Sequence, residues 1–315
     1  MPSLFPKLLK VRAGNLLAIL CFLSIFIYVT FMMDGPNDSV QEAYGQQQLP
    51  YRCENINDIK LIRKLGEGLS KEVFEGMHYD GYHGNRVAVK MVTDEVQVVA
   101  RCLNHLGEDE DSLRCFTFPA MRLMKEILIL QQLKHQNIAR LLGYCLHSDQ
   151  FMTTMDTNVD LKQHGLVAIH EYGTPISISD ILNWSPNQQL HVITELLDLL
   201  IYLDDSPMGS VLVPEIAEKH ILLSLDGHVK LIDFEDVTSE EPVCSKREPC
   251  RHRVPCVKGT CKGFNAKENL DNMHELILRQ LLLNSDIPDL VGSIDTIEHY
   301  NINASQLKDL VMKNM

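Results

Sequence analysis

The pattern of hydrophobic and polar positions first marks an uninterrupted apolar stretch near the N-terminus, over residues 14–33. This stretch carries no formal charge and is long enough to cross a bilayer as a helix. Basic residues precede it and acidic residues follow it, which predicts a cytoplasmic tail over 1–13 and a type II signal anchor. A signal peptide that is cleaved late and a buried core helix are the alternatives, although bulky residues stand where a cleavage site needs small ones.

The pattern changes twice beyond the apolar stretch. Residues 34–55 are polar and without a hydrophobic period, which predicts a stem between membrane and domain. Short alternating or valine-rich runs follow, interrupted by one helical period at 123–133. The predicted strands cover 59–65, 71–77, 86–92, 139–144 and 166–172. The segment 93–119 is polar, and we expect its acidic run at 108–111 to be a solvated loop and not a metal site.

After Gly173 the pattern becomes mainly helical. Helices are predicted over 187–203 and 267–283, and two short strands, 221–225 and 228–232, flank an Asp-Gly turn. Strands with a single helix among them, followed mostly by helices, indicate an α+β fold and not repeating βαβ units. We therefore expect a β-rich N-terminal lobe over 56–173 and a helical C-terminal lobe over 174–315.

Composition narrows the classes of function. The 315 residues include 42 acidic and 29 basic ones, and the net charge of −13 argues against a nucleic-acid partner. Eight of the nine cysteines lie beyond the apolar stretch, and four gather at 244–261 with spacings unlike the paired knuckles of zinc sites. We predict disulfides in preference to zinc, and hence a secretory environment. Sequons at Asn37, Asn183 and Asn303 are typical of a glycoprotein, although three short motifs also arise by chance.

Four groups of residues carry the candidate chemistry. Gly66 and Gly68 lie in a turn between two predicted strands, where a backbone without side chains approaches phosphates closely. Lys90 ends an apolar strand and is costly to bury unpaired, and Glu126 on the predicted helix is its candidate partner. Asp233 ends another apolar strand, where a carboxylate is suited to hold a metal ion. Each group alone is explained more simply by a turn or a surface charge. Their combination indicates a phosphoryl-transfer site.

In order and spacing these motifs resemble those of protein kinases, from about residue 59 to residue 283. The chain more narrowly resembles the secretory-pathway extracellular tyrosine kinases typified by vertebrate lonesome kinase. The narrower resemblance rests on Lys-Glu-Ile-Leu-Ile-Leu at 125–130, Leu-Leu-Gly-Tyr-Cys at 141–145, Ser-Pro-Met-Gly-Ser-Val at 206–211, Pro-Cys at 255–256, Cys-Lys-Gly-Phe-Asn at 261–265 and Asn-Leu at 269–270. It implies a bilobal protein-kinase-like fold behind one N-terminal transmembrane helix.

The resemblance implies a role for each matching position. The implied nucleotide-binding residues are Gly66, Gly68, Val73, Ala88, Lys90, Glu171 and Tyr172. The first two would cover the phosphates, and the backbone of the last two would grip adenine in the hinge. Lys90 would bind the phosphates while Glu126 holds it, and Asp233 would ligate magnesium or manganese. Asp271 matches the helix aspartate that braces the catalytic loop of kinases.

Several positions depart from the kinase pattern. Glu215 stands at the position of the catalytic aspartate and His220 at that of a metal-binding asparagine, where imidazole suits magnesium less well than oxygen. Lys71 replaces the third glycine of the loop, and Glu235 replaces the glycine after Asp233-Phe234, where it offers a replacement oxygen. The cysteine-bearing stretch occupies the place of the usual peptide-docking segment, and the C-terminal lobe is shorter than in a complete kinase.

Two classes of function follow, with a third kept open. The first is a lumenal kinase that transfers the γ-phosphoryl of ATP to secreted or lumenal proteins with magnesium or manganese, on tyrosine by resemblance. It would be anchored in the Golgi or another secretory compartment, or be secreted. The second is a pseudokinase that binds nucleotide or a partner protein without catalysis, because three kinase positions are degenerate. The third is an enzyme that phosphorylates glycans.

Overall fold

A computed structural model of the chain describes residues 49–80, 83–107, 111–146, 161, 165–285, 287–299 and 301–315. Residues 49–315 form one compact unit, separate from residues 1–48. The predicted cytoplasmic tail, the anchor and most of the stem lie outside the described residues, as do Asn37 and most of the acidic run. Among the residues that are described, no helix combines the length and the apolar character needed to span a membrane.

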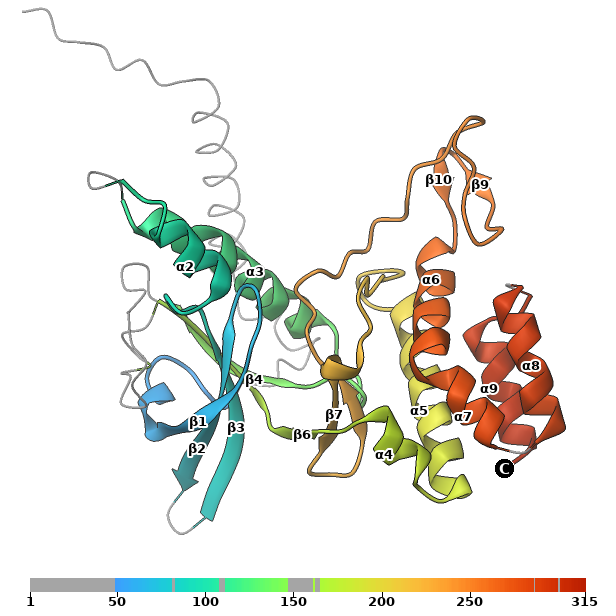
Figure 1. Ribbon diagram of the computed structural model, residues 1–315, viewed down its shortest axis with the longest axis horizontal. Coiled ribbons are helices and arrows are strands. Elements are labelled where there is room, and N and C mark those ends of the chain that lie inside the picture. Colours follow the sequence, from blue (N-terminus) through green and yellow to red (C-terminus); the bar gives the residue numbers. More distant parts are fainter. Residues whose placement is uncertain are drawn as a thin grey trace, which may run out of the picture. The chain divides into compact units, whose positions relative to one another are not determined.

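The N-terminal lobe is a five-stranded antiparallel sheet in the order β1-β2-β3-β5-β4 (Figure 1). A short 3-10 helix, η1 (Ile56–Asp58), leads into it. The strands are β1 (Ile59–Glu67), β2 (Glu72–Asp80), β3 (His83–Met91), β4 (Leu141–Leu146) and β5 (Leu166–Glu171). All five predicted strands are thus confirmed to within a few residues. Alternation decides the faces: Val87, Val89 and Met91 of β3 are buried in one core cluster, so Ala88 and Lys90 face the other side.

A long helix, α3 (Leu113–Gln132), packs on β4 and β5. No helix was predicted within the polar segment 93–119, but α2 (Gln97–Leu103) lies within it, and α3 begins at Leu113 instead of residue 123. Val99 of α2 and Phe116 of α3 are buried, whereas Leu113 and Phe118 of α3 are exposed, so apolar residues do not mark one face of the segment. A disulfide between Cys102 and Cys115 joins the two helices.

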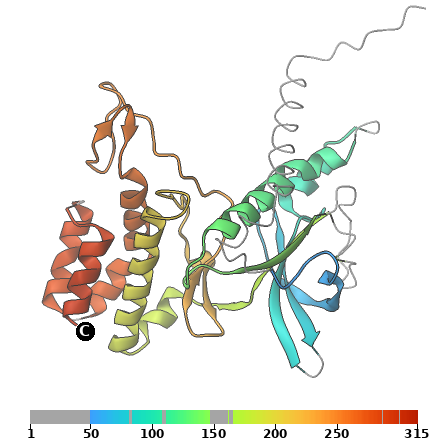
Figure 2. The same ribbon diagram turned by 180° about the vertical axis from the view of Figure 1, so that it is seen from behind.

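The C-terminal lobe is mainly helical, with a small sheet of order β6-β7-β8 (Figures 1 and 2). Its elements are β6 (Gly173–Pro175), α4 (Ile178–Leu182), α5 (Pro186–Asp204), the 3-10 helix η2 (Glu218–His220), β7 (Ile221–Ser224), β8 (Val229–Leu231), β9 (Cys256–Val257), β10 (Thr260–Cys261), α6 (Phe264–Met273), the π-helix η3 (His274–Leu278), α7 (Arg279–Asn284), α8 (Pro288–Glu298) and α9 (Ala304–Lys313). The predicted α+β organisation in two lobes is confirmed.

Two details of this lobe went beyond the predictions. The single helix expected over 267–283 is divided into α6, η3 and α7, since a one-turn π-helix interrupts it. The chain after Asn284 folds back as α8 and α9, and α9 packs along α5. Leu290, Leu307 and Val311 from these last helices are fully buried in the core of the lobe.

The two lobes share a core cluster. Leu123 and Ile127 of α3 belong to the same cluster as Leu199 of α5 and Phe234, and all four are inaccessible to solvent. Because Phe234 is fixed there, the backbone on either side of it is held in place, including Asp233 immediately before it.

The cysteine cluster forms disulfides, as predicted. Cys244 pairs with Cys256 and Cys250 with Cys261, around the two-stranded hairpin of β9 and β10. A further disulfide, Cys53–Cys145, ties the segment before β1 to β4. The two disulfides around the hairpin hold residues 244–261, in the stretch that follows Asp233, in one covalent framework.

Candidate functional site

The register of the sheet gathers the predicted nucleotide-binding residues on one face. In β2 and β3, Val73 pairs with Lys90, and in β3 and β5, Ala88 pairs with His170. Residues directly opposite each other in an antiparallel pair point to the same side, and so do residues two apart in one strand. Val73, Ala88 and Lys90 therefore share the face on which α3 packs.

Lys90 and Glu126 form the predicted ion pair. The Lys90 Nζ lies 2.6 Å from the Glu126 Oε1, and both side chains are buried, Glu126 completely. Burial opposes ionisation of Glu126, but the ammonium groups of Lys71 and Lys90 hold the pKa of its carboxyl well below its ordinary value. The pair is thus a charged one, which fixes the Lys90 ammonium at the end of its strand.

Asp233 is connected to this pair by Lys71, which contacts both Asp233 and Glu126. The backbone of Asp233 is in the left-handed region, with a φ of 71°, an uncommon conformation for a residue other than glycine that clusters at functional sites. Its Oδ1 lies 2.6 Å from the Nζ of Lys71. Burial opposes ionisation here as well, yet Lys71 and Lys90 lower the pKa of Asp233, so the carboxylate is charged.

The chemistry of the carboxylates fits a divalent cation. Oxygens of Glu126, Asp233 and Glu235 lie within 4.8 Å of one another. Carboxylate oxygens are the ligands that magnesium and manganese prefer. Asp233 and Glu235 are the residues that would hold such an ion, in exchange for Lys71, which contacts one oxygen of each. Glu126 would stay engaged by Lys90.

Lys71 was not predicted to take part in the site. It comes directly before β2, two residues before Val73, and so lies on the same face as Lys90. Its Nζ lies 2.8 Å from Glu126 Oε2, 2.6 Å from Asp233 Oδ1 and 2.9 Å from Glu235 Oε2. Burial alone would favour the neutral amine, but the three carboxylates raise the pKa of Lys71 above its ordinary value.

The glycines of the β1–β2 turn are not required by packing. A Cβ added to Gly66 would meet no described atom within 4 Å, and one added to Gly68 would meet only the carbonyl oxygen of Lys71, at 3.6 Å. The N–H of Gly68 donates to that carbonyl (2.8 Å) and closes the turn. This backbone is thus open to the close approach of a ligand, as the predicted phosphate contact of the two glycines requires.

Glu215 and His220 lie near Asp233 in a different arrangement. His220 Nε2 lies 3.4 Å from Asp233 Oδ2, and its Nδ1 lies 3.2 Å from the backbone oxygen of Glu215. The Glu215 carboxylate itself is 60% exposed and pairs with Lys219 at 2.9 Å, a contact that lowers its pKa. The structure thus brings His220 to Asp233, while the Glu215 side chain stands in solvent.

The hinge residues Glu171 and Tyr172 are buried at the end of β5. The Glu171 side chain is used within the chain, since it accepts from Arg140 and from Lys230 at 2.9 and 2.8 Å. Its backbone N–H donates to the carbonyl of Arg140, so that donor is also occupied. Adenine recognition by the remaining backbone groups stays a prediction.

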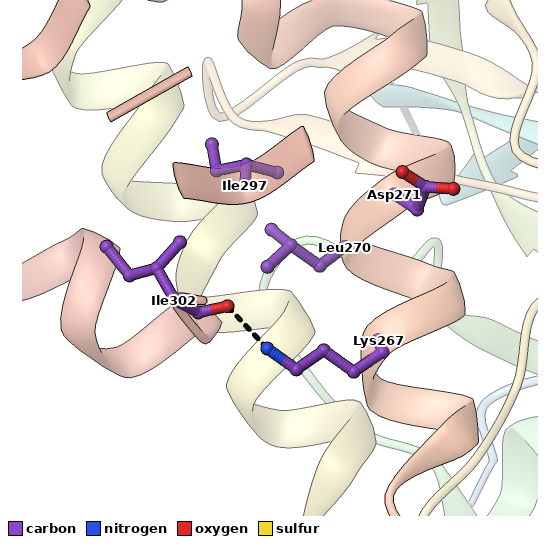
Figure 3. A pocket seen from close by; sticks show the side chains of 5 residues that line it. All are labelled: Lys267, Leu270, Asp271, Ile297 and Ile302. Carbon is purple, nitrogen blue, oxygen red and sulfur yellow. Dashed lines mark hydrogen bonds between the residues drawn. The ribbon is translucent and has the colours of Figure 1, made fainter. Parts of the chain in front are cut away.

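The role expected for Asp271 belongs to Asn269. Asn269 is almost fully buried; its Oδ1 accepts from the N–H of Val213 (2.9 Å) and its Nδ2 donates to the carbonyl of Val211 (2.6 Å). An amide suits this segment, because it accepts from an N–H and also donates to a carbonyl, whereas a carboxylate has no donor. Asp271 instead lines a small pocket with Lys267, Leu270, Ile297 and Ile302 (Figure 3).

His170 is a second residue that the sequence did not single out. It is buried on β5 beside the charged cluster, and its Nε2 has no hydrogen-bond partner among the described residues. Burial and the nearby Lys90 lower its pKa to about 3, so the ring is neutral. The ring borders the site on the side of the predicted hinge.

The chain is similar to protein kinases. It is 28% identical over 253 residues to the extracellular tyrosine-protein kinase PKDCC of Homo sapiens, an alignment covering 78% of this chain and 48% of that protein. Wall-associated receptor kinase-like 10 of Arabidopsis thaliana is 28% identical over 203 residues, covering 64% and 22%, and cyclin-dependent kinase 9 of Homo sapiens is 26% identical over 198 residues, covering 61% and 45%. No family model matches the chain.

These similarities agree with the fold and the site. The predicted resemblance to extracellular tyrosine-protein kinases is confirmed, and the wider matches support a place in the protein-kinase-like superfamily. The chain spans about half the length of PKDCC and less than half of the other two relatives.

Proposed function

We propose that this protein is a kinase of the secretory pathway that transfers the γ-phosphoryl of ATP to the tyrosine hydroxyl of secreted or lumenal proteins. The observation that carries the proposal is the convergence of Lys90, Glu126 and Asp233 in one buried, charged cluster below the glycine turn. The tyrosine acceptor and the compartment are supported by the similarity to PKDCC, and the compartment also by the disulfides.

Each residue of the site has a separate role in the transfer. Lys90 binds the phosphates, held by Glu126, and the turn at Gly66 and Gly68 covers them. Asp233 and Glu235 would hold magnesium or manganese, which supplies positive charge to the phosphates. Glu215 accepts the proton of the acceptor hydroxyl, whose oxygen bonds to the γ-phosphorus while the bond from that phosphorus to the bridging oxygen of ADP breaks.

A second candidate is a pseudokinase that binds nucleotide without transferring its phosphoryl group. The observation that favours it is the Glu215 carboxylate, which is exposed and engaged by Lys219 instead of facing Asp233. A base in that position needs Lys219 or the segment before η2 to move when the acceptor binds.

Phosphoryl transfer from labelled ATP to protein acceptors separates the two candidates. The purified full-length protein would be assayed with magnesium or manganese beside Asp233→Ala and Lys90→Met, and thermal unfolding would be recorded with and without nucleotide. Transfer that exceeds both variants establishes the kinase. Nucleotide-dependent stabilisation of the wild-type protein without transfer establishes the pseudokinase, and the absence of both excludes a nucleotide site.

A further inference from the structure

Two departures from the kinase pattern contact each other. Lys71 stands where kinases have the third glycine of the loop, and Glu235 stands where they have the glycine after Asp-Phe. In the structure the Lys71 Nζ lies 2.9 Å from the Glu235 Oε2, and both side chains are at least nine-tenths buried. The two residues add one positive and one negative charge, so their presence leaves the net charge of the site unchanged.

Glu235 is held from three sides. Besides Lys71, its carboxylate accepts from the Ser70 hydroxyl at 2.7 Å and pairs with Arg122 of α3 at 2.9 Å. Ser70 and Lys71 belong to the turn of the glycine loop, so Glu235 connects that loop to α3 and to the segment of Asp233. A carboxylate with this many donors is positioned by its surroundings and positions Lys71 in turn.

Lys71 and Lys90 are diagonal neighbours on one sheet face. Val73 pairs directly with Lys90, and Lys71 stands two residues before Val73. Diagonal neighbours of this kind are close enough for long side chains to reach one target. Here both ammonium groups reach the same carboxylate, that of Glu126, at 2.6 and 2.8 Å.

We propose that Lys71 is a second phosphate-binding lysine, which acts beside Lys90 and is held in position by Glu235 before the nucleotide and its cation bind. The proposal rests on the proposed nucleotide site. With Asp233 and Glu235 engaged by a divalent cation, Lys71 keeps Glu126 alone among its three partners, and its flexible stem lets the ammonium turn to the phosphates. Glu235 and Asp233 are thus shared between the two states of the site.

The alternative is a purely structural lysine. In that case Lys71 neutralises the three carboxylates permanently and does not contact the nucleotide. The two roles differ in which part of the nucleotide they affect, because a phosphate-binding residue discriminates ATP from adenosine and a structural residue does not.

Binding of ATP and of adenosine, by fluorescence competition or calorimetry on the full-length protein, tests the proposal. Lys71→Met leaves carboxylates unpaired, so the main variant is the double substitution Lys71→Met with Glu235→Gln, which removes both charges together. Lys60→Met, an exposed lysine on β1, is the matched control. Thermal unfolding of each variant confirms that the fold is retained.

Because Glu235 would also hold the cation, Glu235→Gln alone is the reference for the double variant. We expect the double variant to bind ATP at least about tenfold more weakly than Glu235→Gln, the loss of one charge-assisted contact, while the affinity for adenosine changes less than about twofold. Lys60→Met changes neither affinity. Equal changes for ATP and adenosine, or no change for either, would overturn the inference about Lys71 and leave the proposed function intact. If the wild-type protein does not bind ATP, the inference and the proposed function fall together.

Discussion

The two sides of the candidate site are built in different ways. On the phosphate side, Lys71, Lys90, Glu126 and Glu235 are all buried and every charge has a partner within 3 Å. On the side of the acceptor hydroxyl, Glu215 and Lys219 are 60% and 67% exposed and pair with each other at the surface. The first arrangement is buried and fully paired without a ligand, whereas the second is exposed to what binds.

This difference shows which part of the chemistry the fold itself supplies. Removing one partner of a buried ion pair strongly destabilises a protein, so substitutions on the phosphate side should also lower the stability of the domain. An exposed pair contributes little to stability and rearranges easily. Substitutions on the phosphate side are therefore expected to change stability and nucleotide binding, and those on the hydroxyl side to change transfer.

The largest effect is expected from Glu126→Gln. The substitution leaves the Lys71 and Lys90 ammonium groups without the buried carboxylate that both contact, and removing one partner of a buried pair costs about 3–5 kcal/mol. Urea unfolding measures the loss in free energy of unfolding. Glu240→Gln, an exposed glutamate in the same lobe as Asp233, should change it by less than about 0.5 kcal/mol. A loss of the same small size for Glu126→Gln would contradict the buried pair.

Asn269→Ala should come next. It leaves the N–H of Val213 and the carbonyl of Val211 unpaired in the core, at a cost of about 2–3 kcal/mol. Because this segment leads to Glu215, transfer should slow while the affinity for ATP stays within about twofold. Asp271→Asn is the control that separates the two neighbouring positions. A larger loss of stability from the control would restore the original prediction for Asp271.

His170 gives the phosphate side a pH dependence. Its pKa is about 3 in the folded protein against 6.5 ordinarily, so the unfolded chain binds a proton that the folded chain excludes. The free energy of unfolding therefore falls as the pH decreases from 6.5 toward 3, by about 1.4 kcal/mol for each pH unit, because the unfolded chain gains the proton.

Unfolding of wild-type protein and His170→Gln between pH 7 and pH 5 checks this dependence. The variant should show the shallower decline with falling pH, and His105→Gln on the surface should follow the wild type. Parallel curves for wild type and His170→Gln would mean that the ring is not held neutral.

Lys219→Ala should have the smallest effect on stability, below about 0.5 kcal/mol, since the pair with Glu215 is exposed. Its effect should appear in the pH profile of transfer. The hydrogen bond from Lys219 lowers the pKa of Glu215, so its removal returns that pKa toward the ordinary value. The acidic limb of the profile then moves to higher pH, because the base is protonated earlier. An unmoved limb would place the base elsewhere.

The sequence predicted the strands and the pair of Lys90 and Glu126 because each has a local signal. Alternation of apolar and polar residues indicates a strand, and a lysine buried at the end of an apolar strand requires a carboxylate as its partner. Lys71 has no such signal. Its place beside Lys90 depends on the register of β2 on β3, which the length of the glycine turn does not fix.

Other residues were missed for similar physical reasons. Nothing in the sequence near Asn269 marks it, because its partners, the N–H of Val213 and the carbonyl of Val211, come from a segment distant in sequence. The helices over 97–119 were missed because they are stabilised by a disulfide between them and by packing in a core shared with the C-terminal lobe. Contacts between distant segments decide both cases, and no local pattern carries them.

The rate of phosphoryl transfer by Glu215→Gln at saturating ATP tests most directly whether the phosphate side and the hydroxyl side act separately. The account predicts that transfer falls about a hundredfold or more, the contribution of a general base, while the affinity for ATP stays within about twofold of the wild type. Transfer at the wild-type rate, or a loss of ATP affinity of the same size as the loss of transfer, would contradict it.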